Sequence, residues 1–280
     1  MASALQGAGH VDARRRVLTG AVTTALILGL CLFTGHGYPG VLARLWPLLG
    51  AFNPSIWMRA TVSGPALSQA RARLPVAVLR GLFEALAGAA AVEVAGLRVF
   101  GLVVTAVDGT VVDLADTAEI RERYATPRGG RFPQARIVTL VVCGTRRVLG
   151  AVVDSCARSE QALWDELVNL LAPGTLNLSD RNFFSMHRWR TAAGTGAHLI
   201  WRVKNGAKSL PAKVISTLDD GSHLVRLRES DSMLTARRKA SGEKKATRLA
   251  DITARLVEFT VTTTDEAGRS RTTRFRVLTT

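Results

Sequence analysis

The chain has 280 residues, of which 47% are hydrophobic, so an intrinsically disordered chain is excluded and one large core or two smaller ones can form. Its 37 Lys and Arg outnumber 22 Asp and Glu, which gives a net charge of +15 and favours a polyanion partner, either nucleic acid or an anionic membrane surface. Three widely spaced cysteines without a CxxC pair argue against a disulfide framework or a zinc site.

The N-terminal third is predicted to be helical. Ala, Leu and Arg dominate residues 12–95, and apolar residues recur at helical spacing in "LPVAVLRGLFEALAG". The apolar run 17–33 follows three arginines and resembles a signal sequence or membrane anchor. A spanning helix needs about 20 strongly apolar residues, so we expect a buried helix here and no membrane partner. Residues 1–97 are predicted to form a helical domain that contacts DNA.

From residue 98 the hydrophobic pattern changes to that of strands. Residues 102–113 are rich in Val, with a bend expected at Gly109, and 135–144 and 146–156 form a predicted hairpin. An amphipathic helix (159–173), a strand (175–180), a helix (185–193) and a strand (197–205) follow. Three strands followed by alternating helices and strands predict a mixed sheet with helices on its faces, an α+β or mixed α/β fold covering 98–206.

The last segment, 207–280, is predicted to be a basic β-rich domain. Two hairpins turn at Asp220-Gly221 and at 266–268, and the segment between them, 236–248, is expected to be a polar loop. Residues 201–280 carry 17 Lys and Arg against nine Asp and Glu, an excess of eight positive charges. A solvated surface and a phosphate-binding surface explain this charge equally well.

Two aspartates follow predicted strands: Asp108 after "LVVTAV" and Asp180 after "TLNLS". In "TLNLS", the alternation of leucines with Asn177 and Ser179 predicts a strand whose leucines face the core. If the two strands are neighbours, their carboxylates meet, and a divalent cation would offset the repulsion between them. Oxygen ligands suit Mg²⁺ or Mn²⁺, and such a site in a polyanion-binding protein indicates a nuclease or polynucleotidyl transferase. The alternative is that each Asp is an ordinary turn or cap residue.

The series "VDGTVVDLADT", "QARIVTLVVCGTRRVLGAVVDS", "SEQALWDELVNLL", "LNLSDRNFFS" and "LIWRVKN" resembles the DDE transposases of bacterial insertion sequences. The similarity is greatest to the group whose ribonuclease-H-like catalytic domain carries a β-strand insertion, and it covers residues 20–280. It implies a cytoplasmic bacterial enzyme that binds double-stranded DNA at transposon ends, as a homodimer associated with the nucleoid, and cleaves and transfers strands with Mg²⁺ or Mn²⁺.

Carried over to this chain, the first two catalytic and metal-binding acids of the family fall on Asp108 and Asp180. Many relatives have Gly at the position of Asn182, and Asn tolerates a positive φ better than other residues. Phe183 and Phe184 are expected to anchor the following helix in the core, and Arg181 to lie near a bound phosphate or to pair with a carboxylate. The basic side chains predicted to contact DNA are Arg181, Arg202, Lys204, Arg237, Arg238, Lys239, Lys244 and Lys245.

The third acid of the family is a Glu on a helix beyond the insertion, within a Tyr-x-x-Arg-x-x-x-Glu motif. Neither Tyr38 nor Tyr124 begins such a motif, so no third catalytic residue is assigned. The interpretation is a transposase truncated at its C-terminus, without its final catalytic helix. Two alternatives stay open: a catalytically silent DNA-binding remnant, and a basic protein anchored in a membrane by residues 17–33.

Overall fold

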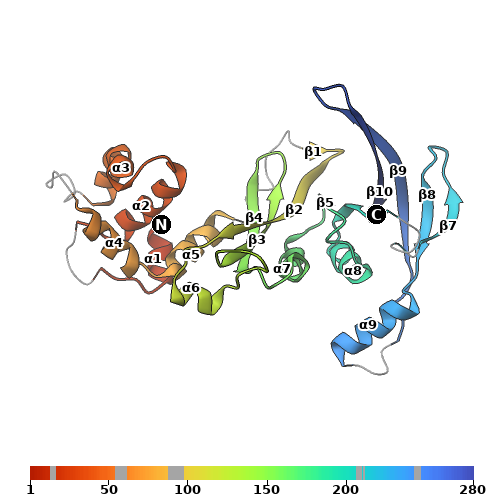
Figure 1. Cartoon of the computed structure of the whole chain (residues 1–280), viewed down its shortest axis with the longest axis horizontal. Coiled ribbons are helices and arrows are strands. Elements are labelled where there is room, and N and C mark those ends of the chain that lie inside the picture. Colours follow the sequence, from red (N-terminus) through yellow and green to blue (C-terminus); the bar gives the residue numbers. More distant parts are fainter. Residues whose placement is uncertain (13–16, 54–61, 88–97, 206–209, 211, 243–246) are drawn as a thin grey trace. The chain divides into compact units, whose positions relative to one another are not determined.

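The computed structural model describes residues 1–12, 17–53, 62–87, 98–205, 210, 212–242 and 247–280. The chain divides into two compact units, Met1–Ala87 and Gly88–Thr280. Among the residues that the structure describes, the regular elements of the first unit are all helices, whereas the second unit is built on a sheet (Figure 1). The predicted core and insertion domains therefore lie within one compact unit.

The first unit is the helical region that the sequence predicts, together with a short helix at its start. Its helices are α1 (Ala2–Gly7), α2 (Gly20–Leu32), α3 (Tyr38–Phe52), α4 (Gly64–Arg73) and α5 (Val76–Leu86). α2 begins where the Thr19 side chain accepts a hydrogen bond from the amide of Val22. Val22, Leu26 and several neighbours on α2 are buried in a core shared with α3 and α4.

The apolar run 17–33 thus contains a buried helix, as predicted. Thr23 and Thr24, which reduce its hydrophobicity, are also buried, and their hydroxyls donate to the carbonyls of Thr19 and Gly20 one turn earlier. Across the described ranges, no helix has both the length and the hydrophobicity needed to cross a membrane.

The second unit consists of one mixed sheet and the helices between its strands. The strands are β1 (Arg98–Val99), β2 (Leu102–Asp113), β3 (Gln134–Val142), β4 (Arg147–Ser155), β5 (Thr175–Ser179), β6 (His198–Arg202), β7 (Ala212–Thr217), β8 (His223–Leu227), β9 (Ile252–Thr264) and β10 (Ser270–Thr279). The helices are α6 (Ala118–Arg123), α7 (Glu160–Leu167), a 3₁₀ turn (Val168–Leu170), α8 (Met186–Gly194) and α9 (Asp231–Ser241).

The strand order is β4-β3-β2-β5-β6-β10-β9-β8-β7, with β1 paired to β2. The pairs β2–β5 and β5–β6 are parallel, and the other pairs are antiparallel. The mixed α/β fold is confirmed, and the first five strands of this path, three antiparallel followed by two parallel, form the mixed sheet that the ribonuclease-H-like resemblance predicts. β9 and β10 extend past the other strands as a two-stranded ribbon, dark blue in Figure 1.

One face of the sheet packs against α7 and α8. Trp164 of α7, Trp189 of α8 and Trp201 of β6 are fully buried, and their rings meet edge to face. Phe183 is 1% exposed and packs against Trp164, while Phe184 lies partly buried against Trp189. The prediction that both phenylalanines anchor the segment before α8 is confirmed.

Two local predictions were wrong. β2 continues through Gly109 to Asp113 without a break, because β3 pairs with it along this whole stretch. Residues 236–241, expected in a loop, belong to α9. Ser230 caps the start of that helix, basic side chains occupy its last turn, and Gly242 ends it in the left-handed conformation.

Candidate active site

The two aspartates singled out by the sequence lie on neighbouring parallel strands. β2 and β5 pair from Val103↔Thr175 to Ala106↔Leu178. Continuing this register by two residues along each strand brings Asp108 alongside Asp180. Adjacent strands in a sheet lie about 4.8 Å apart. The strands of the two aspartates are therefore neighbours, which is the condition that the sequence analysis set for their carboxylates to meet.

Both carboxylates belong to the sheet face opposite α7. Side chains alternate along a strand, and Val107, which is buried against the α7 side, separates Asp108 from that face. Asp180 is in register with Arg202 one residue beyond the pair Ser179↔Trp201, and it accepts a hydrogen bond from that arginine. Asp108 is inside β2 rather than at its end, which corrects the prediction. The strand that ends at this level is β5.

Asp180 is accessible but not isolated. Its side chain is 51% exposed, and its Oδ1 lies 3.4 Å from Nη1 of Arg202. The guanidinium of Arg202 also lies over the ring of Phe275 on β10, 4.4 Å from the ring centre. Arg202, predicted to contact DNA, therefore serves at least as the countercharge of Asp180.

Under the aspartates, a buried polar network joins the three central strands. Asn177 on β5 is 0% exposed; its Oδ1 accepts from the indole N–H of Trp201 at 2.9 Å, and its Nδ2 donates to Thr105 Oγ1 at 3.2 Å. The sequence interpretation assigned the leucines of "TLNLS" to the core face, whereas Asn177 and Ser179 point toward α7 and α8. Because a buried amide must be hydrogen-bonded, Asn177 fixes how β2, β5 and β6 align. In the sequence, Trp201 on the following strand indicates a partner for a buried Asn177.

A further carboxylate lies at the start of α7. Glu160 accepts a hydrogen bond from Asn182 Nδ2, and the adjacent Gln161 donates from Nε2 to Asn182 Oδ1 at 2.8 Å and to its carbonyl at 3.0 Å. Asn182 has no positive φ, so its presence is not a matter of backbone tolerance as the sequence suggested. The sequence analysis did not single out Glu160, because an acidic residue in the first turn is common in helices.

The chemistry of the donors fits a hard cation, within limits. Two carboxylates on paired strands offer oxygen ligands, and Mg²⁺ is commonly held by one or two carboxylates with water and substrate phosphate completing its shell. In the part of the chain that the structure describes, no three His, Cys, Asp or Glu side chains are arranged to hold a metal ion. Asp108 and Asp180 therefore suit one weakly held ion.

Comparison with known proteins finds similarity to transposases of insertion sequences. Residues 1–84 match the family described as the insertion element 4 transposase N-terminal domain. The transposase InsG of insertion sequence element IS4 from Escherichia coli K12 is 26% identical over 264 residues, which is 91% of this chain and 55% of that protein. The chain is similar to the IS4 transposases. The predicted resemblance to insertion-sequence transposases is confirmed, and the chain spans about half the length of the curated relative it matches.

A solved structure, a piggyBac transposase synaptic complex with hairpin DNA, is similar over 45% of this chain and 30% of its own. With a TM-score of 0.32 and 11% identity, this likeness adds nothing to the assignment.

The other basic candidates of this IS4-related chain differ in their surroundings. Arg181 and Lys239 are exposed. Arg237 instead pairs with the buried Glu229 and donates to the carbonyl of Thr247 at 2.7 Å. Lys204 and Arg238 each have further contacts, and Lys244 and Lys245 lie outside the described residues.

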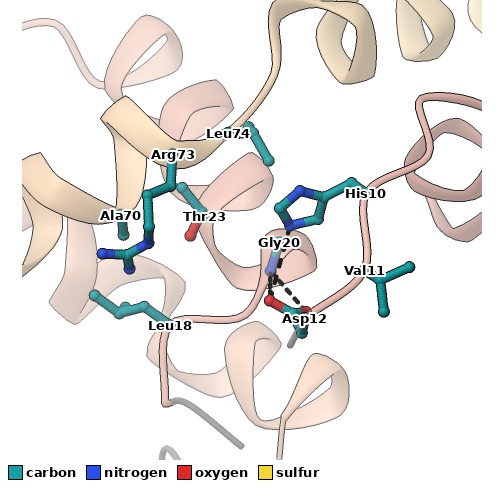
Figure 2. A pocket seen from close by; sticks show the side chains of 9 residues that line it. All are labelled: His10, Val11, Asp12, Leu18, Gly20, Thr23, Ala70, Arg73 and Leu74. Atoms are coloured by element: carbon teal, nitrogen blue, oxygen red, sulfur yellow. Dashed lines mark hydrogen bonds and ion pairs between the residues drawn. The ribbon is translucent and has the colours of Figure 1, made fainter. Parts of the chain in front are cut away.

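A hollow in the helical unit offers no comparable chemistry. It encloses about 300 Å³ at the start of α2, and Figure 2 shows His10, Asp12 and Arg73 on its walls. The carboxylate of Asp12 accepts from the amide of Gly20 at 3.1 and 3.2 Å, and His10 Nε2 lies 3.8 Å from it (Figure 2). Asp12 thus stabilises the start of α2, which explains its position without a ligand.

Proposed function

We propose that this chain acts in the transposition of a bacterial insertion sequence: it binds DNA at the ends of the element and uses Asp108 and Asp180 to support metal-dependent strand cleavage and transfer. The observation that carries this proposal is the parallel register of β2 and β5, which sets the two aspartates side by side on one face. The relationship to the IS4 transposases supports it.

Each group has a definite task in this proposal. Asp108 and Asp180 would hold Mg²⁺ or Mn²⁺, and the bound ion would supply Lewis-acid stabilisation of the negative charge on the phosphate. Arg202 lies beside Asp180 on the β6 side and balances its charge while no cation is bound. The excess of positive charge in residues 201–280 binds the DNA backbone. Activity on chromosomal DNA places the protein in the bacterial cytoplasm with the nucleoid, and paired element ends call for two copies.

The test is a nicking assay with the DNA that flanks the coding region of this element, in Mg²⁺ and in Mn²⁺. We expect strand cleavage that Asp108→Asn and Asp180→Asn each reduce about 10²- to 10³-fold, because several kcal/mol of charge stabilisation are lost. Asp113→Asn is the matched control, since Asp113 lies on the same strand but beyond the end of β5. Cleavage that survives both active-site changes contradicts the proposal.

One observation favours a second candidate, a DNA-binding protein without catalysis. Within the described residues, no third carboxylate joins Asp108 and Asp180 in a metal-binding group. This candidate predicts specific retention of the flanking DNA in a gel-shift assay with no metal-dependent nicking by the wild-type chain. Both assays on the same preparation decide between the two candidates.

A further inference from the structure

The loop that carries Asp180 begins where β5 ends, so its position depends on contacts outside the sheet. Asp180 directly follows Ser179, the last residue of the strand. The amide of Phe183 donates to the carbonyl of Asp180 at 3.0 Å, which closes a tight turn over residues 180–183. Between them, the side chain and carbonyl of Asn182 are held by the first two residues of α7, Glu160 and Gln161.

The carboxylate of Glu160 reaches this loop because Gly109 leaves room for it. A Cβ placed on Gly109 would lie 2.8 Å from both Cγ and Cδ of Glu160, well inside van der Waals contact. Gly109 does not have a positive φ, so no turn geometry requires glycine at this position. Its lack of a side chain instead allows the carboxylate to lie against β2, immediately after Asp108.

Glu160 therefore contacts a residue close to each aspartate: Gly109, one residue after Asp108, and Asn182, two residues after Asp180. It does so from the α7 side of the sheet, opposite the face to which Asp108 belongs. We propose that Glu160 is a positioning residue: through Asn182 it holds the turn of Asp180 against Gly109 of β2 and so sets the spacing of the two aspartates. This inference rests on the proposed function of Asp108 and Asp180 as a metal site.

The arrangement explains the residue types of Gly109, Glu160 and Asn182, which sequence patterns leave unrelated. Asn182 supplies a donor for Glu160 and an acceptor for Gln161, which a glycine could not do. Groups that orient metal ligands commonly change metal affinity about 10- to 100-fold when removed. Glu160 and Asn182 act one step away from Asp180, so we expect the lower end of that range.

The test measures Mn²⁺ binding to the full chain by electron paramagnetic resonance, without DNA and without reference to activity. Glu160→Ala should weaken binding about tenfold. Glu160→Gln keeps an acceptor for Asn182 and should retain most of the affinity. Glu166→Ala is the control on the same helix, because Glu166 pairs with Arg158. Wild-type affinity in Glu160→Ala overturns the inference, and so does a Glu160→Gln variant as weak as Glu160→Ala.

A second arm uses the glycine. Gly109→Ala should displace the Glu160 side chain and weaken Mn²⁺ binding about as much as Glu160→Ala does. In the Glu160→Ala background the same change should have no further effect, because the new methyl group then meets no carboxylate. Independent, multiplying losses from the two substitutions contradict the inference.

Failure of the inference can be told apart from failure of the proposed function. Asp108→Asn and Asp180→Asn must each abolish Mn²⁺ binding if the proposed site is correct. If they do and the Glu160 and Gly109 variants bind normally, only the positioning role fails. Circular dichroism and thermal unfolding of every variant establish that altered binding does not reflect a misfolded chain.

Discussion

Two carboxylates of the sheet unit, Glu229 and Asp180, are both paired with arginine but in opposite ways. Glu229 is 3% exposed, and both of its oxygens accept from Arg237, at 2.9 and 3.1 Å; Oε2 also accepts from the amide of Leu249 at 3.1 Å. These bonds, those from Arg237 first, lower its pKa to about 2. Asp180 is half exposed and, within the described residues, has one side-chain partner, Arg202 at 3.4 Å.

The difference separates a structural charge from a chemical one. Glu229 has its acceptors filled by the protein, which secures the joint between β8, α9 and β9 and leaves little capacity for a ligand. Asp180 keeps most of its acceptor capacity facing solvent, next to a second carboxylate in register. A carboxylate that binds a cation must have this incomplete satisfaction, since a fully paired one would first have to lose its partners.

The comparison predicts its largest effect for stability. Glu229→Gln removes the carboxylate that the partly buried Arg237 contacts and should lower the free energy of unfolding by about 3 kcal/mol. Asp180→Asn removes one long hydrogen bond at an exposed site and should change it by no more than about 0.5 kcal/mol. Equilibrium urea denaturation of the two variants measures both values. Equal losses would show that the two carboxylates do not differ in kind.

The pKa of Glu229 gives the same comparison a pH dependence. Because its folded pKa of about 2 lies below the ordinary value of 4.5, the ionised group stabilises the fold above pH 4.5, and this contribution is lost as the pH falls toward 2. This contribution amounts to roughly 3 kcal/mol.

The pKa values of other paired carboxylates, among them Asp154 and Glu258, are also lowered in the folded protein. The measurement is therefore the difference between wild type and Glu229→Gln in the free energy of unfolding from pH 5 to pH 2. That difference should shrink steadily as the pH falls. A constant difference would mean that the pKa of Glu229 is not lowered in the folded protein.

Apart from α6 and α9, the sequence predicted the order of the main strands and helices in the sheet unit, because these elements have clear local signals. Ser159 and Ser185 cap α7 and α8, and the turn at Asp220-Gly221 joins β7 to β8, as expected from these residue types. The adjacency of the two aspartates was also predictable, since it follows once β2 and β5, the strands that precede them in the sequence analysis, lie side by side.

The contacts around the aspartates were not predictable, because they join residues distant in the chain. Glu160 meets Asn182 across 22 positions, and Asn177 meets Thr105 across 72. The inward-facing Asn177 contradicts the rule that apolar residues occupy the buried face, and only its partner Trp201 makes it acceptable. α9 was not predicted because the segment between its caps, Ser230 and Gly242, is polar and has the composition of a loop.

Arg202 allows the pairing of Asp180 to be tested directly. A guanidinium beside the carboxylate repels a second cation and occupies Oδ1, so Arg202→Gln should raise the affinity for Mn²⁺. Two unit charges about 4 Å apart in water interact by about 1 kcal/mol. Loss of a repulsion of this size between Arg202 and the cation corresponds to a roughly fivefold rise in affinity. Electron paramagnetic resonance at low ionic strength measures it, with Arg181→Gln as an exposed control next to the same aspartate. A weaker affinity in Arg202→Gln would instead make this arginine a support for the Asp180 side chain.

The smallest effect separates the two basic residues of α9 that were predicted alike. Lys239 is exposed in the last turn, whereas Arg237 is committed to Glu229. If α9 faces DNA, Lys239→Ala should reduce the slope of log K against log salt concentration by about 1 and leave the unfolding free energy unchanged. Arg237→Ala should lower the unfolding free energy by about 3 kcal/mol, and its effect on DNA affinity should disappear once binding is corrected for the folded fraction. Fluorescence anisotropy with labelled duplex DNA over a salt series measures the slope. An unchanged slope in Lys239→Ala would remove α9 from the DNA-binding surface and leave the β9–β10 ribbon, with Arg271 and Arg274, as the place to look for phosphate contacts.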